Sequence, residues 1–435
     1  MMKKNDIVTL AITSANSDGQ GVARAESGEV IFVANAIPGE NVSARVLKVG
    51  KSSAWAKSIE VLSASPERIT TECPYYPKCG GCSYLHMSYA EELRQKLERV
   101  NDAFQRIGGL ELRAERIIPS IRRFGYRNKA IFNFAVNPSG GSLLGFYRAN
   151  SHDVIPVDNC LLQSEFANNA ANALNSWAKE NGISIYDESS GKGLLRKLFT
   201  RGTQVCVVAN GKPRLVGELI DEVRSAVPEC TSLMWNEQRG TTNVVFGEKF
   251  HLLFGSETVT INGTELSPDS FYQVNSEQAE RLYEIALEFA DLRSVETALD
   301  LYCGVGTLTL LIAAKAAKVT GVEINPSAIA GASLNAKRNK VTNADFVHSD
   351  VSVAELPAAD CVFVDPPRKG LSAELIENLT ALSPKRIAYI SCDPATLARD
   401  LKLLNQRGYR AVRAEAVDMF PGTAHVETVV EINRQ

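Results

Sequence analysis

The chain has 435 residues, of which 45% are hydrophobic and 22% are charged, and its formal net charge is -3. This length predicts about two to four domains, and the composition excludes a disordered or fibrous protein. No stretch approaches the roughly 20 apolar residues that span a bilayer, and the N-terminus MMKKNDIVTL lacks a signal-peptide pattern, so we expect a cytoplasmic protein. The net charge excludes a uniformly basic nucleic-acid binder, so any contact with RNA must come from local patches.

The first 62 residues alternate short β-type runs with turns rich in Gly and Pro. The runs lie at residues 7–12, 30–33, 42–46 and 58–62. This pattern predicts a small all-β barrel over residues 1–62. Small barrels have many different functions. The pattern therefore fits a barrel that only packs on the rest of the chain as well as it fits a barrel that binds a ligand.

The middle of the chain combines a cysteine-rich segment, one helix and a second set of β-type runs. Apolar residues at helical spacing predict a helix over residues 89–108, namely Leu93, Leu97, Val100 and Phe104. The β-type runs lie at residues 129–136, 202–208 and 241–246, around a helical insert at 168–179. We therefore expect a central α+β domain formed by residues 63–88 and 122–262.

From about residue 295 onward, β-type and helical segments alternate regularly. The predicted strands are residues 297–301, 319–324, 344–348, 361–365 and 386–391, followed by two final strands. The predicted helices are residues 308–317, 327–339, 374–382 and 395–405. This alternation is typical of a doubly wound, Rossmann-like α/β domain, to which we assign residues 89–121 and 263–435.

A cofactor site is predicted where the first of these strands ends. DLYCGVGT places Gly304 and Gly306 between a strand and a helix, where the backbone can turn tightly and approach a ligand. Glu323 follows Gly304 by 19 residues and ends the next strand, the position from which an acid binds ribose hydroxyls. The dinucleotide fingerprint GxGxxG is incomplete here, because its third glycine is absent. A nucleoside-type cofactor without a diphosphate fits better, and S-adenosylmethionine is such a molecule.

Two further acids end later strands of the same domain. Asp350 ends the third strand and is placed near the adenine, although a helix N-cap or turn role is equally compatible with the pattern. Asp365 precedes two prolines in VFVDPPRKG, and these prolines fix a rigid turn at the carboxyl edge of the sheet. We therefore predict that Asp365 faces the ligand crevice rather than merely ending its strand.

Cys392 is the candidate nucleophile and Glu427 is the candidate general base. Cys392 lies in IAYISCDPATL, at a strand end beside the same crevice and just before a helix whose N-terminus favours a thiolate. The alternative for a cysteine in an apolar strand is an inert core residue. Glu427 begins the last strand, in PGTAHVETVV, where the alternative is an exposed strand side chain. His425, two residues earlier, ranks second as a base.

Five motifs taken together resemble those of the bacterial RNA uracil-C5 methyltransferase family. They are SFYQVN at 270–275, DLYCGVGT, VFVDPPRKG, ISCDPATLARD and AHVETVV, in this order along the chain. The resemblance covers the whole chain and implies a class I methyltransferase fold that uses S-adenosylmethionine. It matches Gln273, Tyr302, Glu323 and Asp365 to the family's cofactor positions, Cys392 to its nucleophile and Glu427 to its base.

The chemistry of such a family explains why a thiol is needed. C5 of uracil is too weak a nucleophile to take a methyl group directly, so a nucleophile first adds at C6 and the negative charge develops on C5. After methyl transfer, a base must remove the C5 proton so that the thiolate can leave. A carboxylate in a partly desolvated pocket suits removal of the C5 proton. We therefore expect Cys392 to add at C6 and Glu427 to remove the proton.

The cysteine-rich segment has the spacing of a metal site. Cys73, Cys79 and Cys82 form C-x5-C-x2-C, and His86 follows at an offset that would complete a zinc site of three cysteines and one histidine. The family resemblance instead implies Cys160 as the fourth ligand of a [4Fe-4S] cluster. We favour the iron-sulfur alternative, with a structural or RNA-positioning role.

Two groups of basic residues are candidates for phosphate contacts, although either group taken alone is also compatible with a solvated face. The first is Arg113, Arg116, Arg122, Arg123, Arg127 and Lys129, around Phe124 and Tyr126; the second is Lys192, Arg196, Lys197 and Arg201. The N-terminal barrel resembles a TRAM domain, a small RNA-binding module. Family members with both this barrel and the cluster typically act on 23S ribosomal RNA, which is therefore the expected substrate.

Three alternatives stay open at this point. Some archaeal members with the same domains act on transfer RNA. A non-catalytic RNA-binding or ribosome-assembly protein with a methyltransferase fold is disfavoured by intact Cys392 and Glu427. An amino-methylating enzyme is suggested by the sequence DPP but would need no cysteine nucleophile. We expect a monomer that has no membrane association and no obligate protein partner.

Overall fold

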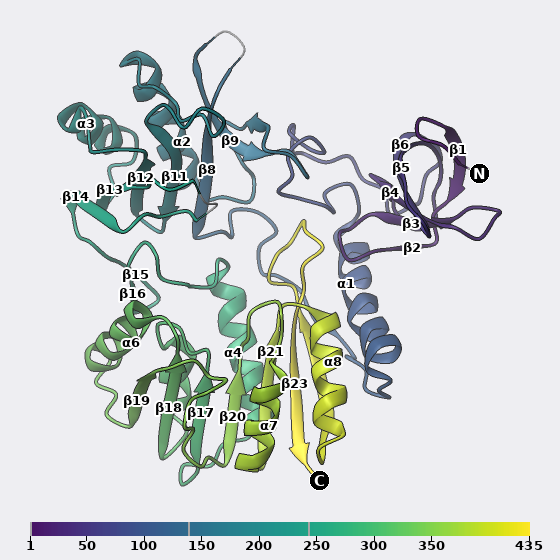
Figure 1. The fold of residues 1–435 in the computed structure, drawn as a ribbon, viewed down its shortest axis with the longest axis vertical. Coiled ribbons are helices and arrows are strands. Elements are labelled where there is room, and N and C mark those ends of the chain that lie inside the picture. The colour runs from purple at the N-terminus through teal and green to yellow at the C-terminus, as the bar shows by residue number, and fades with distance from the viewer. Residues whose placement is uncertain (1, 138–139, 242–243) are drawn as a thin grey trace.

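The computed structural model describes residues 2–137, 140–241 and 244–435, which form three sheet-based regions (Figure 1). An N-terminal barrel, a central α+β region and a C-terminal α/β region follow one another, and helix α1 (Tyr89–Ala103) runs from the barrel along the side of the C-terminal region. Among the described residues, no helix combines the length and the apolar character needed to cross a membrane.

The N-terminal barrel is built from one six-stranded sheet with the order β1-β5-β6-β4-β3-β2. Its strands are β1 (Ile7–Ala11), β2 (Ser14–Ala15), β3 (Gly21–Arg24), β4 (Val30–Ala34), β5 (Asn41–Val49) and β6 (Ser53–Ser63). Alternate residues point inward, so Val42, Ala44 and Val46 of β5 are all buried. The predicted all-β module is confirmed. Strands β2 and β3 have only 2 and 4 residues, too few to show an alternating pattern in the sequence.

The central region is a seven-stranded sheet covered by two helices. The order is β10-β9-β8-β11-β12-β13-β14. Its strands are β8 (Lys129–Val136), β9 (Ser142–Tyr147), β10 (Val154–Pro156), β11 (Leu195–Arg201), β12 (Gln204–Ala209), β13 (Ser232–Glu237) and β14 (Lys249–Gly255), and its helices are α2 (Glu165–Glu180) and α3 (Val216–Ala226). Leu174 and Trp177 of α2 pack with Leu198 and Trp235 of the sheet. The predicted strand at 129–136 and the helical insert are both confirmed.

The strand predicted at residues 241–246 is wrong in its described part. Residues 242 and 243 lie outside the described residues, and residues 244–246 form a loop. The edge strand is instead β14, a few positions later. The apolar run misled the prediction because Phe246 packs edge-on against Phe199, with ring centroids 5.1 Å apart, and is therefore a core contact made from a loop.

The C-terminal region is an eight-stranded sheet with the order β19-β18-β17-β20-β21-β23-β22-β7. Its strands are β7 (Ile117–Ile118), β17 (Thr297–Leu301), β18 (Lys318–Glu323), β19 (Ala344–His348), β20 (Cys361–Val364), β21 (Arg386–Ser391), β22 (Tyr409–Val417) and β23 (Glu427–Arg434). A short hairpin of β15 (Val259–Ile261) and β16 (Thr264–Leu266) precedes it. Strands β17 to β21 are mutually parallel, whereas β23 runs antiparallel to β21. The doubly wound prediction is confirmed.

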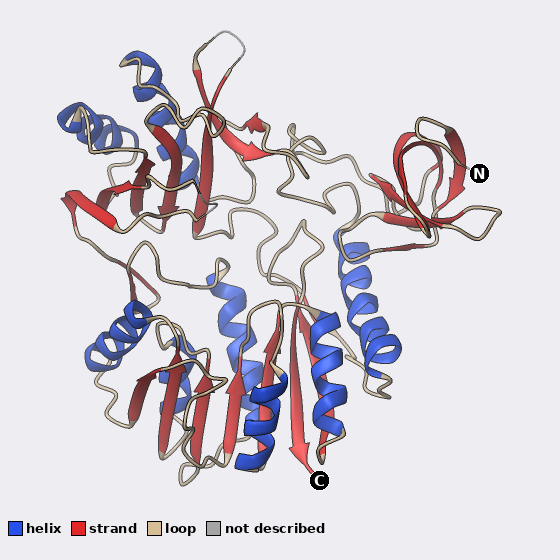
Figure 2. Ribbon diagram, viewed as in Figure 1, coloured by secondary structure: helices blue, strands red, loops and turns tan. Residues whose placement is uncertain are grey.

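Helices cover both faces of this sheet (Figure 2). They are α4 (Ser276–Ala290), α5 (Thr307–Ala313), α6 (Pro326–Arg338), α7 (Ala373–Leu382) and α8 (Pro394–Asn405). Successive residues of β20 enter different cores: Val362 packs with residues of α7 and α8, and Phe363 packs with residues of α4 and α5. The chain order reverses between β17 and β20, and ligands of open α/β sheets bind at the carboxyl ends of the strands at such a switch point.

Helix α1 buries a polar face rather than the apolar face that the sequence predicts. It continues into a π-helical turn, η1 (Phe104–Gly108), so the predicted range of 89–108 is confirmed. Val100 and Phe104 are fully buried, but Leu93 and Leu97 are only partly buried. Glu92 and Lys96 occupy the buried face in their place. This burial of charge requires partners from other parts of the chain.

Candidate active site

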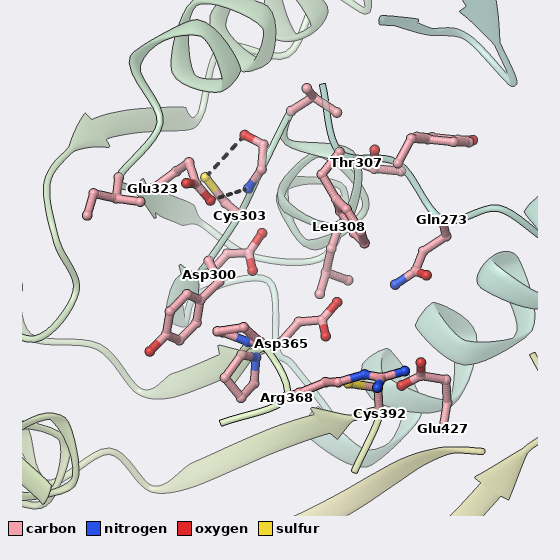
Figure 3. A pocket seen from close by; sticks show the side chains of 18 of the residues that line it. Gln273, Asp300, Cys303, Thr307, Leu308, Glu323, Asp365, Arg368, Cys392 and Glu427 are labelled. Atoms are coloured by element: carbon pink, nitrogen blue, oxygen red, sulfur yellow. Dashed lines mark hydrogen bonds between the residues drawn. The ribbon is translucent and has the colours of Figure 1, made fainter. Parts of the chain in front are cut away.

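A cavity of about 800 Å³ opens at the carboxyl ends of the parallel strands, where the strand order reverses. It is lined by every candidate cofactor and catalytic residue of the sequence: Gln273, Tyr302, Gly304, Glu323, Asp350, Asp365, Cys392 and Glu427. Figure 3 shows Glu323 at one end of this cavity and Cys392 beside Glu427 at the other, with Asp365 between them. The fold therefore brings one elongated site together from seven separate segments of the chain.

The turn after β17 is tight and holds Glu323 against the backbone. Gly304 and Gly306 both have positive φ, at 54° and 82°, and a Cβ at Gly306 would lie 3.1 Å from the Phe346 ring. Glu323 accepts hydrogen bonds from the N–H groups of Gly304 at 3.2 Å and Asn325 at 2.9 Å. These bonds hold the carboxylate at the end of β18, where its other lone pairs remain for ligand hydroxyls.

Asp350 lies just after β19, at the neighbouring strand end, and is a turn residue that also lines the cavity. Its carboxylate accepts the N–H of Ser352 at 2.9 Å, which makes it a turn residue and lowers its pKa. The same residue lines the cavity. Ile324, which follows Glu323, is 60% exposed and also lines the cavity. An apolar side chain left open beside two acids suits a flat ring such as adenine, and sequence analysis missed it because one Ile at a strand end is not distinctive.

Two further carboxyl groups line the cavity, of which Asp300 is buried and Asp365 is partly buried. Asp300 of β17 is 1% exposed and accepts a hydrogen bond from the Thr309 hydroxyl at 2.5 Å. Burial raises the pKa of Asp300 to about 7, and desolvation raises the pKa of Asp365 to about 7 as well. Carboxyl groups whose pKa lies near 7 change their charge near neutral pH, and a bound cationic ligand would favour their ionised form. Asp300 was missed, although an acid inside the apolar strand TALDL is itself a signal of burial.

Cys392 follows β21 and precedes α8, as predicted, but its thiol is not activated in the ligand-free protein. Burial and the facing Glu427 and Asp365 carboxyl groups raise the pKa of Cys392 to about 12. The expectation that the helix N-terminus favours a thiolate is therefore wrong for this state. Burial contributes most to this rise in pKa, and the carboxylate of Asp393, which caps α8 and accepts the Thr396 N–H at 2.8 Å, adds a smaller contribution.

Glu427 is buried rather than exposed, which excludes the alternative of a solvated strand residue. It is 2% exposed, and burial together with the nearby Asp365 raises its pKa to about 8. His425 lines the same cavity, and burial and the adjacent Arg368 lower its pKa to about 4. His425 is therefore neutral near pH 7, and both residues have the geometry to accept a proton.

Arg368 is the functional candidate that sequence analysis missed. Its guanidinium lies beside Cys392 and Glu427 in Figure 3 and is 3.2 Å from His425 Nε2. Its positive charge opposes the rise in the pKa of Cys392 and of Glu427 that burial causes. Three hydrogen bonds hold the loop of Arg368 against α8. Thr396 Oγ1 donates to the Arg368 carbonyl at 3.1 Å, and Arg399 donates to the Lys369 carbonyl at 2.9 Å. The Leu371 N–H donates to Asp400 at 2.8 Å. The helix that follows the thiol therefore also positions this cation.

The cysteines gather around a second, smaller cavity. Cys73, Cys79, Cys82 and Cys160 line it together with apolar side chains of Leu85, Phe146, Val157, Leu161 and Leu162. The backbone N–H groups of Leu162 and Gln163 point at the Cys160 sulfur and lower the pKa of that thiol, although burial raises it overall. The Gly81 N–H has the same effect on Cys79. His86 instead bonds the Tyr76 hydroxyl through Nδ1 and stacks on that ring. The four-cysteine set is thus brought together, and the set of three cysteines with His86 is not.

The two basic groups contain both buried and exposed residues. Arg201 is 1% exposed and donates to the carbonyls of Ser267 and Ser270, so it belongs to the core. Burial lowers the pKa of Lys129 to about 8. Arg196 lies 4.1 Å from the Tyr186 ring centroid and Lys197 lies 5.4 Å from that of Tyr147, which is the cation and aromatic pairing that nucleic-acid surfaces use.

A doubly wound sheet, an acid after its second strand and a nucleoside-sized cavity at the switch point define a methyltransferase fold. Comparisons with known proteins name the family. The family described as tRNA (uracil-5-)-methyltransferase matches residues 256–359 and 349–435, and the TRAM domain matches residues 3–59. The chain therefore belongs to the tRNA (uracil-5-)-methyltransferase family of RNA methyltransferases and carries an N-terminal TRAM domain.

Relatives match along the whole length. A protein from Bacillus cereus named "uncharacterized RNA methyltransferase" is 39% identical, over 100% of this chain and 98% of the relative. A protein of Halalkalibacterium halodurans with a similar name is 39% identical over 98% of this chain and 97% of its own length. Among solved structures, the Pyrococcus abyssi tRNA (uracil-54, C5)-methyltransferase in complex with S-adenosyl-L-homocysteine is 28% identical, with a TM-score of 0.79 over 98% of this chain and 100% of that chain.

Proposed function

We propose that the protein transfers a methyl group from S-adenosylmethionine to C5 of a uridine in RNA, through a covalent bond between Cys392 and C6 of the base. The observation that carries this proposal is the placement of Cys392, Glu427 and Asp365 around one end of the cavity whose other end is formed by Gly304 and Glu323. A methyl donor bound at the Glu323 end and a target uracil bound at the Cys392 end would meet in the middle of the cavity.

The donor end divides into parts that suit each part of S-adenosylmethionine. Glu323 binds the ribose hydroxyls, and Asp350 with Ile324 borders the adenine. Gln273 and Tyr302 line the wall beside the Gly304 turn and complete the donor site. Asp365, and Asp300 behind it, offer carboxyl groups to the cationic sulfonium.

At the other end, Cys392 and Glu427 perform the bond changes on uracil. The Cys392 thiol loses its proton to solvent as sulfur bonds to C6, and the C5–C6 electron pair moves toward the C4 carbonyl to form an enolate. C5 then attacks the methyl carbon, and the bond from that carbon to the donor sulfur breaks. Glu427 in its ionised form then removes the C5 proton, and the returning electron pair restores the C5–C6 double bond and expels the Cys392 thiolate.

The pH dependence of the rate should follow the Glu427 carboxyl group. A base must be ionised, and Glu427 with a pKa of about 8 is mostly protonated at neutral pH. The single-turnover rate should therefore rise by about tenfold per pH unit up to about pH 8. Affinity for S-adenosylhomocysteine over the same pH range is the control that separates binding from chemistry. A flat rate profile from about pH 6 to about pH 8 would argue against an elevated pKa on the base.

For the RNA target we propose 23S ribosomal RNA, supported by the TRAM domain together with the four-cysteine cavity. Transfer RNA is the second candidate, favoured by the Pyrococcus abyssi neighbour, whose name specifies tRNA. The target uridine must leave its stack to reach Cys392, so it lies in a loop or an opened helix. We place the enzyme in the cytoplasm, where both RNAs are found.

Labelled methyl transfer tests the reaction and the target separately. Purified 23S ribosomal RNA and a transfer RNA pool, both from cells that lack this methyltransferase, are incubated with the protein and the labelled donor, digested and mapped. Labelled 5-methyluridine in 23S RNA is the expected result. The same nucleoside in transfer RNA alone overturns the ribosomal target but keeps the reaction. Label on an exocyclic nitrogen overturns the reaction itself.

We propose further that Cys73, Cys79, Cys82 and Cys160 hold a [4Fe-4S] cluster. An apolar cavity with four cysteines and inward N–H groups is a suitable donor set for it. A single zinc ion would need its ligands within about 2.3 Å. His86, the fourth ligand that a three-cysteine zinc site would need, bonds the Tyr76 hydroxyl instead. The cluster would supply structural cross-linking of the cysteine loop to the central sheet.

Replacing the proposed fourth ligand should remove the iron. Cys160→Ala is expected to lose most of the bound iron and the visible absorption of anaerobically purified protein, because three ligands hold a cluster poorly. His86→Ala is the matched control and should retain both, since His86 bonds Tyr76. Zinc retained by Cys160→Ala and lost by His86→Ala would establish the zinc alternative instead.

The domain division follows from these proposals. Residues 1–62 form the TRAM barrel, and residues 63–88 with 122–262 form the central iron-sulfur and RNA-binding domain. Residues 89–121 with 263–435 form the methyltransferase domain, because β7 pairs with β22 and joins the early segment to the late sheet. Each proposed domain therefore has its own large sheet. The boundary at residues 262 and 263 divides the β15–β16 hairpin, whose Val259 and Leu266 pack against Val305 of the late region.

A further inference from the structure

The loop of residues 418–426 carries His425 into the cavity and leads directly to Glu427. It lies between β22 and β23, above the end of β23 in Figure 1. Its backbone carbonyls are bound by side chains from distant segments. The donors are Gln278 to Asp418 at 3.1 Å, Asn275 to Met419 at 3.1 Å, Lys96 to Phe420 at 3.2 Å, Tyr126 to Pro421 at 3.1 Å and Arg99 to Ala424 at 2.7 Å. The shape of the loop is thus imposed from outside it.

Lys96 of α1 is the charged centre of these contacts. Its side chain is 0% exposed, and its ammonium donates to Glu92 at 2.7 Å, to Asp418 at 2.6 Å and to the Phe420 carbonyl at 3.2 Å. A lysine ammonium has three N–H donors, and all three have acceptors here. Lys96 therefore joins its own helix to two points of the loop.

The two carboxylates extend these links further along the loop. Glu92 accepts the Gly422 N–H at 2.7 Å and lies 3.7 Å from Arg123. Asp418 accepts the Tyr89 hydroxyl at 2.8 Å. The cluster therefore balances the cations Lys96 and Arg123 against the anions Glu92 and Asp418.

Stability alone does not explain such a cluster. Buried ion pairs are often no more stabilising than well-packed apolar residues of the same size, but they specify one geometry because each charge must keep its partners. The cysteine segment contributes to that geometry as well: the N–H groups of Ser83 and Tyr84 donate to the Gly422 carbonyl at 2.9 Å and 3.0 Å. The loop is consequently held by several segments that are far from it in sequence.

We propose that Lys96 is a positioning residue for the proton-removal step, which acts by fixing the loop that orients Glu427. This inference rests on the proposed function. Lys96 does not line the cavity, so it acts only through Asp418, Phe420 and, by way of Glu92, Gly422. Proton transfer requires the base within hydrogen-bond reach of the C5 proton, and a misplacement of about 1 Å can cost about 100-fold in rate.

The test follows two events in one turnover, using RNA that carries tritium at C5 of uridine. Methyl incorporation reports the transfer step, and tritium release reports removal of the C5 proton. In Lys96→Met, we expect methyl incorporation within about threefold of wild type, tritium release slowed by about 10- to 100-fold, and accumulation of the covalent protein–RNA adduct. Arg94→Met is the matched control, because Arg94 lies on the same helix but pairs with Glu91 and Glu98 outside the loop.

A second variant separates positioning from folding. Lys96→Met leaves Glu92 and Asp418 with one cation, so Lys96→Met with Asp418→Asn restores the charge balance, and thermal unfolding confirms that it folds. Both variants should show the lag between methyl incorporation and tritium release. Equal slowing of the two events, or wild-type rates for both, overturns the positioning role. Absence of tritium release in the wild-type enzyme overturns the proposed function instead, whatever the Lys96 variants do.

Discussion

Replacing Cys392 by alanine should abolish methyl transfer, lowering the rate by about 10⁴-fold or more. Without a thiol, no bond forms at C6, and C5 of uracil stays too weak a nucleophile to attack the donor. The half-buried thiol faces Glu427 and Asp365 in the cavity, so its loss removes the group proposed to touch the base. Single-turnover incorporation of labelled methyl into RNA measures the effect.

Two measurements separate a chemical defect from a structural one in this variant. The affinity of Cys392→Ala for S-adenosylhomocysteine should stay close to that of wild type, because Glu323 and the Gly304 turn form the donor end. Cys361→Ala, in the neighbouring strand β20 and buried in the core, should remain active. Substantial transfer by Cys392→Ala would rule out the covalent mechanism and favour direct attack by an amino group.

Replacing Glu427 by glutamine should trap the covalent adduct. Glutamine fills the same buried position but cannot accept the C5 proton, so the methylated base stays bound to Cys392. Loss of a general base costs about 10²- to 10⁴-fold in rate. A denaturing gel should show a slowly migrating band that carries both RNA and the methyl label.

The double variant Cys392→Ala with Glu427→Gln should show no such band, because the adduct needs the thiol. His425→Gln tests the second-ranked base, which is neutral at pH 7 and lies beside Arg368. An adduct that accumulates in His425→Gln but not in Glu427→Gln would transfer the role of base to His425.

The sequence predicts the C-terminal sheet closely and the central region less well. Strands β17, β19 and β21 have the predicted bounds, and β17 and β21 are buried along almost their whole length, as strands of a parallel sheet covered on both faces are. Helix α4 and strands β11 and β13 were not predicted. The run at 241–246 was misassigned because a loop phenylalanine that packs into a core resembles a strand residue.

The sequence by itself determines the order of motifs, the spacing of three cysteines and the residue types of the site, since these are local properties of the chain. Only the tertiary structure decides which groups meet. It places Cys160 with the other three cysteines, turns Arg368 toward the thiol, and buries Lys96 on a helix face expected to be apolar. It also makes the thiol of Cys392 a weak acid rather than a strong one. Desolvation and charge interactions depend on distances between residues that lie far apart in the chain, and no local pattern encodes those distances.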